Sequence, residues 1–260
     1  MKRILHLMWA FYKLSERRLS IGALLIAMFL SISLGFSAIG GEITVEMLVM
    51  NLSGIPGVIL TVLIYLVYSK LVGESKIYLL YNISKVEYAV ALSMSVVLLP
   101  LITLGLSSVI VVAVLTRRLD ALIGILAYII AFMPKCIEYV SLCLIVDALL
   151  GSRASKVLML MLLFVVPVVL TFAVTGAAMT LSKLENLWMR TLFEIYFITD
   201  PYAPLLYSMG IEIPSTRIYG VFKDILTKQC SIIILLSAIF VFSLFTLSVI
   251  IYRRKEVTAR

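Results

Sequence analysis

Three ionisable residues lie in a segment that is otherwise apolar, and they are the first candidates for chemistry. Lys135 and Glu138 are three residues apart, so a helix places them on one face, and Asp147 follows in the same segment. A charge at bilayer depth costs about 2.5 to 3.5 kcal/mol on insertion scales, so such residues face protein or water and need partners. Two interpretations stay open for Lys135 and Glu138: a polar path or moving helix interface, or a structural i, i+3 ion pair. We expect Asp147 to be interfacial.

The residue types that most enzymes need are scarce. His6 is the one histidine of the sequence, which excludes a multi-histidine metal site and makes any Ser-His-Asp triad depend on that residue. No G-x-x-x-x-G-K-[ST] motif occurs, so the chain has no P-loop for ATP. Cys136, Cys143 and Cys230 lack the spacing of metal ligands and are expected to be packing residues. We therefore predict no enzyme, no catalytic residue, no metal site and no cofactor bound by this chain.

The composition is that of a membrane protein. Of the 260 residues, 63% are hydrophobic and 14% are charged, against roughly 45 to 50% and about 25% in soluble proteins. Since about 20 apolar residues cross a bilayer as a helix, we predict an all-α, polytopic protein with one transmembrane domain over residues 1–260. The six predicted spans are residues 21–40, 52–69, 88–115, 121–150, 157–181 and 231–252.

The distribution of basic residues predicts the orientation. With the N-terminus inside, the inner segments 1–20, 70–87, 151–156 and 253–260 hold 14 basic residues and the outer segments hold 7. Short basic loops stay on the cytoplasmic side, so both termini are predicted to be cytoplasmic, in a multi-pass protein of the plasma membrane. The net charge of +8 is then a positive-inside bias, and no nucleic-acid partner is expected.

Two segments outside the spans have helical patterns. Residues 1–20 place Ile4, Leu7, Phe11 and other apolar residues at helical spacing, which predicts an interfacial helix on the inner leaflet. The long outer loop, 182–230, is predicted to hold two short helices. The first has a stripe made of Leu184, Leu187, Trp188, Thr191, Leu192 and Ile195. The second is expected to start with Asp200 as its N-cap before Pro201, and to end at Gly210.

The connector 70–87 is the most informative of the inner loops. It carries basic and acidic residues together with the apolar Ile77, Leu80 and Tyr81, which a simple joining loop does not need. This composition predicts a docking surface for a soluble partner. Ser84 and Glu87 fit the capping box S-x-x-E directly before the third span, and we expect them to cap that helix.

In this context the chain resembles the ABC-2 type permeases, the membrane subunits of type-2 ATP-binding-cassette exporters. The corresponding family loop reads approximately E-x-G-T-x-E-x-L-L-x-x-P-x-S-x-x-E. Residues 73–87 keep the pair Leu79-Leu80, Ser84 and Glu87. Lys76 stands near the place of a family acid, and the family proline is missing. The short basic turn at 149–156 and the basic ending at 252–257 are also similar to this family.

The resemblance implies a function. Two permease copies, or one copy and a paralogue, would pair in the lipid bilayer and form a translocation path. Each would rest on a separate ATPase subunit, which binds ATP and Mg. Loop 70–87 would be the coupling helix in a groove of that ATPase. Its contacts would be Gly73, Glu74, Lys76, Ile77, Leu80 and Tyr81.

Two other functions stay open. A secondary carrier would use Lys135 and Glu138 as an ion-responsive pair, although spans one to three and four to six show no convincing internal repeat. A non-transporting membrane scaffold or assembly factor would instead bind its partner through the outer loop 182–230. The apolar spans select no particular substrate.

Overall fold

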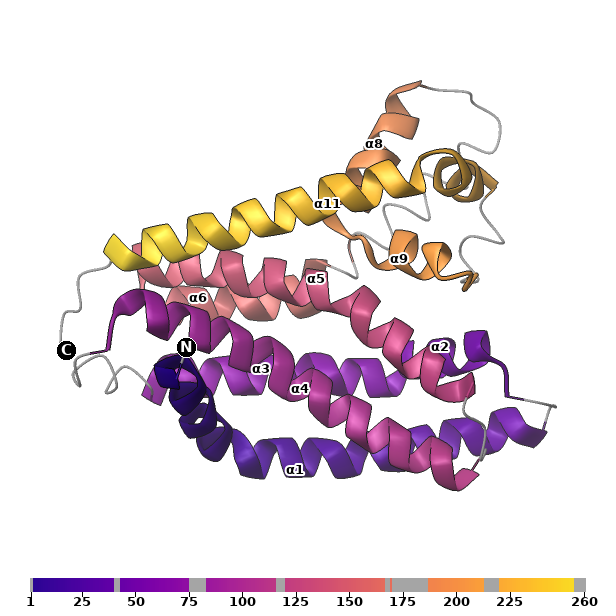
Figure 1. Ribbon diagram of the computed structural model, residues 1–260, viewed down its shortest axis with the longest axis horizontal. Helices are drawn as coiled ribbons and strands as arrows, with labels where there is room; N and C mark the ends of the chain where they lie inside the picture. The colour runs from indigo at the N-terminus through magenta and orange to yellow at the C-terminus, as the bar shows by residue number, and fades with distance from the viewer. Residues whose placement is uncertain are drawn as a thin grey trace.

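The computed structural model describes residues 2–39, 43–74, 83–115, 120–166, 169, 187–212 and 220–254, and this part of the chain is built of helices without strands. Figure 1 shows long helices running side by side, with shorter helices gathered at one end. The elements are α1 (Lys2–Ile39), α2 (Val45–Ser53), α3 (Ile55–Glu74), α4 (Lys85–Leu115), α5 (Asp120–Leu150), α6 (Ser152–Leu160), the π-helix η2 (Met161–Val165), α8 (Leu187–Thr199), α9 (Tyr202–Ser208) and α11 (Gly220–Arg254).

Five helices of the described residues are long and apolar enough to cross a membrane: α1, α3, α4, α5 and α11. They coincide with the first, second, third, fourth and sixth predicted spans. The prediction of a helical, polytopic membrane protein is therefore confirmed. The predicted fifth span, 157–181, begins in α6 and η2, and nearly all of its residues beyond 166 lie outside the described residues.

The first helix differs from the prediction of a separate interfacial helix. α1 is continuous from Lys2 to Ile39, and Figure 1 shows that it bends between a short N-terminal part and a long straight part. The N-terminal part packs on protein, because Phe11 is fully buried and its ring meets that of Tyr88 edge to face at 5.9 Å. The guanidinium of Arg18 donates a hydrogen bond to the carbonyl of Leu66. The amphipathic stripe therefore faces α3 and α4.

A tight break separates α2 from α3. The hydroxyl of Thr44 caps α2 by accepting a hydrogen bond from the N–H of Met47 at 3.2 Å. The N–H of Gly54 then closes the helix on the carbonyls of Met50 and Asn51. Pro56 stands in the first turn of α3, where its missing N–H costs no helical hydrogen bond. The break places Ser53, at the end of α2, and the first turn of α3 beside the same cavity.

α5 is the central helix, since it packs against α2, α4, α6, α9 and α11. It ends at Gly151, whose φ of +89° lies in the left-handed region that favours glycine. The chain reverses there into α6, which packs back on α5.

The two helices predicted for residues 182–230 are present as α8 and α9, and the described part of α8 packs through residues outside the predicted apolar stripe. Phe193 and Phe197 are buried against Ile225, Leu226 and Ile233 of α11. By contrast, Thr191 is exposed and Ile195 is 52% exposed. The side chains of the other stripe residues lie outside the described residues. α8 therefore packs on α11 through Phe193 and Phe197, which are one helical turn apart.

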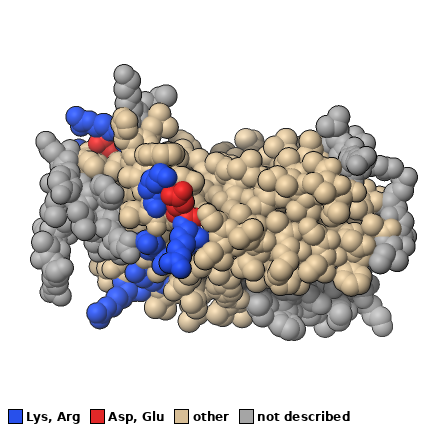
Figure 2. Space-filling view, turned by 90° about the horizontal axis from the view of Figure 1, so that it is seen from below, with Lys and Arg blue, Asp and Glu red and all other residues tan. Residues whose placement is uncertain are grey.

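Basic side chains mark one end of the bundle. The ring of Tyr88 at the start of α4 stacks on Tyr252 at the end of α11, and Tyr68 of α3 contacts Ser155 of α6. These contacts put Lys85, Arg153, Arg253 and Arg254 at the same end. Figure 2 shows Lys and Arg gathered toward one end of the face that it presents, and the described residues at the other end of that face are uncharged.

The start of α4 has the two reciprocal hydrogen bonds of a capping box. The N–H of Glu87 donates to Ser84 Oγ at 3.1 Å, and the N–H of Ser84 donates to Glu87 Oε2 at 3.2 Å.

We predict that Ser84→Ala lowers the free energy of unfolding by about 1 kcal/mol, because the first turn of α4 loses its cap. Hydrogen exchange of the amides at 84–88 should become faster by about fivefold. Ser20→Ala is the control, since that exposed hydroxyl bonds within its own helix. Equal exchange in both variants would contradict a stabilising cap.

Candidate functional site: a cavity between α3, α5, η2 and α9

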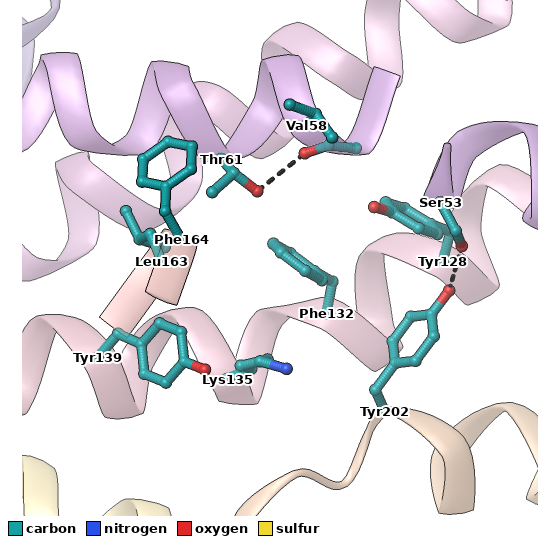
Figure 3. Close-up of a pocket in the computed structure, with 11 residues that line it drawn as sticks. Ser53, Val58, Thr61, Tyr128, Phe132, Lys135, Tyr139, Leu163, Phe164 and Tyr202 are labelled. Atoms are coloured by element: carbon teal, nitrogen blue, oxygen red, sulfur yellow. Dashed lines mark hydrogen bonds between the residues drawn. The ribbon is translucent and has the colours of Figure 1, made fainter. Parts of the chain in front are cut away.

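A cavity of about 480 Å³ lies between helices that are distant in the sequence. Its volume falls in the range of small-molecule sites, roughly 300 to 1,000 Å³. Figure 3 shows α3 and α5 as facing walls, with η2 and α9 toward opposite ends. The lining residues are Ser53, Gly57, Val58, Thr61, Tyr128, Phe132, Lys135, Tyr139, Leu163, Phe164 and Tyr202.

Three aromatic rings form the end of the cavity nearest α9. Tyr128 and Phe132 are one helical turn apart on α5, and their rings stack with centroids 5.7 Å apart. The ring of Tyr202 meets both edge to face, at 5.9 Å and 6.4 Å. Such pairs contribute about 0.5 to 1.5 kcal/mol beyond the area that they bury. The cluster therefore fixes α9 against α5.

The hydroxyl of Tyr202 makes a second attachment. It lies 2.7 Å from Ser53 Oγ at the end of α2, as Figure 3 shows. Burial raises the pKa of Tyr202 to about 12, so the phenol keeps its proton at neutral pH. α9 is thus held to two neighbours through one side chain.

Lys135 pairs with Asp200, the residue between α8 and α9. The ammonium donates a hydrogen bond to Asp200 Oδ2, and the two side chains are 16% and 14% exposed. The ammonium also lies 5.9 Å from the ring centroid of Tyr139. Among the described residues Lys135 therefore pairs with Asp200, from the 182–230 segment, and not with Glu138 in the i, i+3 ion pair.

Asp200 is not the N-cap of α9, which corrects a second prediction. The N-cap position belongs to Pro201, and no side chain caps this helix. The carboxylate of Asp200 points to Lys135 instead, because a buried ammonium attracts it more strongly than backbone N–H groups do.

Glu138 is a buried acid next to this pair. It is 8% exposed, and among the described residues its Oε2 has no hydrogen-bond partner; the same is true of Asp200 Oδ1. Lys135 and Asp200 both act on Glu138 electrostatically. The site therefore combines one ammonium with two carboxyl groups.

A π-helix forms the far wall of the cavity. In η2 the N–H of Val166 bonds to the carbonyl of Met161, five residues back. This wider turn is rare and is frequently found at functional sites. Leu163 and Phe164 of η2 line the cavity and make that end apolar.

Asp147 belongs to a second, separate polar cluster. It is 1% exposed and forms a side-chain hydrogen bond with Tyr252, so it is buried in protein, and its expected interfacial depth stays a prediction. Tyr252 stacks on Tyr88, and Tyr68 hydrogen-bonds with Ser155 nearby. This cluster is at the basic end of the bundle, where the connector also starts and ends.

The structure does not bring the predicted coupling residues into the cavity. Gly73 and Glu74 form the last turn of α3, and Ser84 and Glu87 start α4. The remaining coupling residues, Lys76, Ile77, Leu80 and Tyr81, lie outside the described residues.

Of the predicted site residues, Lys135 lines the cavity and Glu138 lies beside it. The sequence prediction missed Ser53, Thr61, Tyr128, Phe132 and Tyr202. Aromatic residues at i, i+4 in an apolar helix look like ordinary core, so periodicity carried no signal for them.

Comparisons of the chain with protein-family models, with curated proteins and with solved structures find no match.

We predict that Lys135→Met lowers the free energy of unfolding by about 3 kcal/mol, because Asp200 is left as a largely buried charge without its partner. Adding Asp200→Asn should restore most of that loss, since it removes the unpaired charge. Lys223→Met is the matched control: it breaks an exposed pair with Glu212 and should cost under about 1 kcal/mol. Thermal unfolding of the purified variants gives the comparison, and additive effects would show that Lys135 and Asp200 do not depend on each other.

Gly57 and Gly35 offer a second matched pair. A Cβ at Gly57 would lie 2.8 Å from the carbonyl oxygen of Leu52 and 3.0 Å from the hydroxyl of Tyr128, whereas one at Gly35 meets nothing within 4 Å. We expect Gly57→Ala to destabilise the protein by about 1 to 3 kcal/mol and Gly35→Ala to be neutral or stabilising. Equal melting temperatures for the two variants would contradict the close approach at Gly57.

Proposed function

We propose that this chain is the permease subunit of an ATP-binding-cassette exporter. It forms a translocation path with a second permease, either a copy or a paralogue, and is driven by a separate ATPase subunit. That ATPase binds ATP and Mg and docks on the 70–87 connector. The chain itself acts as a transport subunit and not as an enzyme.

The position of the connector carries this proposal. The end of α3 and the start of α4 lie at the end of the bundle where both termini are found (Figure 1). The same end holds the basic residues of α4, α6 and α11, which favours a cytoplasmic location. A capping box fixes the point where the connector becomes α4. A soluble ATPase at the cytoplasmic face would reach this loop directly.

The packing supports a route for force from the connector into the membrane domain. α3 and α4 both pack on α1, and α4 also packs on α5 and α11. A displacement of the connector would therefore move two membrane helices together against three others. The mechanism needs two states of the domain that differ in these contacts, with ATP binding favouring one of them.

A secondary carrier is the alternative that one observation favours. Glu138 has a buried oxygen without a partner, and it lies beside the Lys135–Asp200 pair. Buried acids of this kind serve as proton or ion sites in carriers. The carrier would work without an ATPase and would stop in Glu138→Gln.

The test is purification of the full chain from native membranes, with identification of the proteins that accompany it. We expect an ATPase with nucleotide-binding motifs. In the double variant Leu80→Asp with Tyr81→Asp, its recovery should fall at least tenfold while membrane insertion stays normal. Met209→Asp is the control, because Met209 is exposed just after α9, at the other end of the bundle.

Three results would overturn the proposal. The first is an ATPase that binds and turns over normally with the altered connector. The second is transport that persists in membranes stripped of ATPases and stops in Glu138→Gln, which would establish the carrier instead. Binding of an external partner through 182–230 without transport would establish the scaffold.

A further inference from the structure

We infer that the cavity between α3, α5, η2 and α9 is a binding site for an uncharged amphiphile that carries a hydroxyl group. This site lies within one chain, so it is independent of the path that the proposed function places between two permeases.

The polar groups of the cavity select a hydroxyl. Thr61 and Lys135 face each other from α3 and α5 (Figure 3). The hydroxyl of Thr61 donates its hydrogen to the carbonyl of Gly57 at 2.9 Å, so its oxygen remains an acceptor. Lys135 has three N–H donors, and Asp200 is the hydrogen-bond acceptor that the described residues give it. A ligand hydroxyl can therefore accept a hydrogen bond from Lys135, and a second hydroxyl of the ligand can donate one to Thr61 on the opposite wall.

The charges next to the cavity exclude an ionic head group. An anion would lie close to Lys135 but also to the carboxyl groups of Asp200 and Glu138. A cation would meet the ammonium of Lys135 at the cavity wall. Because the Lys135–Asp200 pair is already neutral, neither ion gains enough to offset the loss of its hydration. An uncharged head group avoids this cost.

The two ends of the cavity differ in polarity, which suits an amphiphile. Leu163 and Phe164 make the η2 end apolar, and Val58 adds to the apolar wall on α3. Ser53 and the hydroxyl of Tyr202 make the α9 end polar. A ligand with its hydroxyl at Thr61 and Lys135 therefore directs its apolar chain toward η2. A monoacylglycerol of medium chain length has this chemistry.

The experiment uses the full chain in phosphatidylcholine nanodiscs. The probe is a 1-monoacylglycerol with a photoreactive diazirine in its acyl chain, and labelled peptides are mapped by mass spectrometry. We expect labelling at Leu163 and Phe164. The concentration needed to halve the labelling should be at least tenfold lower for unlabelled 1-decanoylglycerol than for two control compounds. These are methyl decanoate, which has no hydroxyl, and decanoate, which is anionic.

Thr61→Val tests the hydroxyl directly, because it keeps the shape of the side chain and removes one hydrogen bond of about 1 kcal/mol. The concentration of 1-decanoylglycerol needed to compete with the probe should rise about fivefold in Thr61→Val. In Thr61→Ser it should return to the value of the unaltered protein. Thr103→Val is the matched control, since Thr103 makes the same bond to the carbonyl four residues back, on α4.

Three results would overturn the inference. They are labelling spread over the lipid-facing helices without a maximum at η2, equal competition by 1-decanoylglycerol and methyl decanoate, and equal effects of the two valine variants. None of these measurements needs an ATPase, so failure here leaves the proposed exporter function standing, and loss of that function leaves this site standing.

Discussion

The ion pair between Lys135 and Asp200 is the interaction on which the position of α8 and α9 depends. In a chain with 63% hydrophobic residues, an ammonium in the middle of a membrane helix needs a partner of opposite charge. Asp200 meets that need from the junction of α8 and α9, 65 residues further along the chain. The need of Lys135 for a partner therefore fixes where the junction of α8 and α9 lies, and with it the end wall of the cavity.

Tyr202 holds α9, the end wall of the cavity, against α5 and α2. Its ring packs on Tyr128 and Phe132, its hydroxyl bonds to Ser53, and the pair of Asp200 with Lys135 is two residues away. Each contact contributes about 1 kcal/mol, which is modest, but all three join α9 to α5 and α2. Separation of α9 from the bundle would have to break them together, so the wall moves as one unit or stays closed.

Sequence patterns predicted the elements better than their contacts. Hydropathy located five membrane helices and capping chemistry located the start of α4, because both depend on residues close together in the chain. The partner of Lys135 was missed because helical spacing favours Glu138, whereas tertiary packing supplied Asp200. The contact of α8 with α11 was missed for a similar reason: the stripe of Leu, Trp and Ile is a local pattern, whereas Phe193 and Phe197 are buried against α11 through tertiary packing. The aromatic residues that line the cavity could not be predicted, because their spacing in the sequence is the same as that of ordinary core residues.

α5 carries both buried polar clusters, and this constrains how the domain can move. Lys135 and Asp147 are 12 residues apart, which is about 18 Å along a helix. The first is tied to the external helices and the second to Tyr252 at the end of α11. A shift of α5 along its axis would strain an ion pair at one site and a buried hydrogen bond at the other. Motions that keep α5, α9 and α11 together avoid both costs.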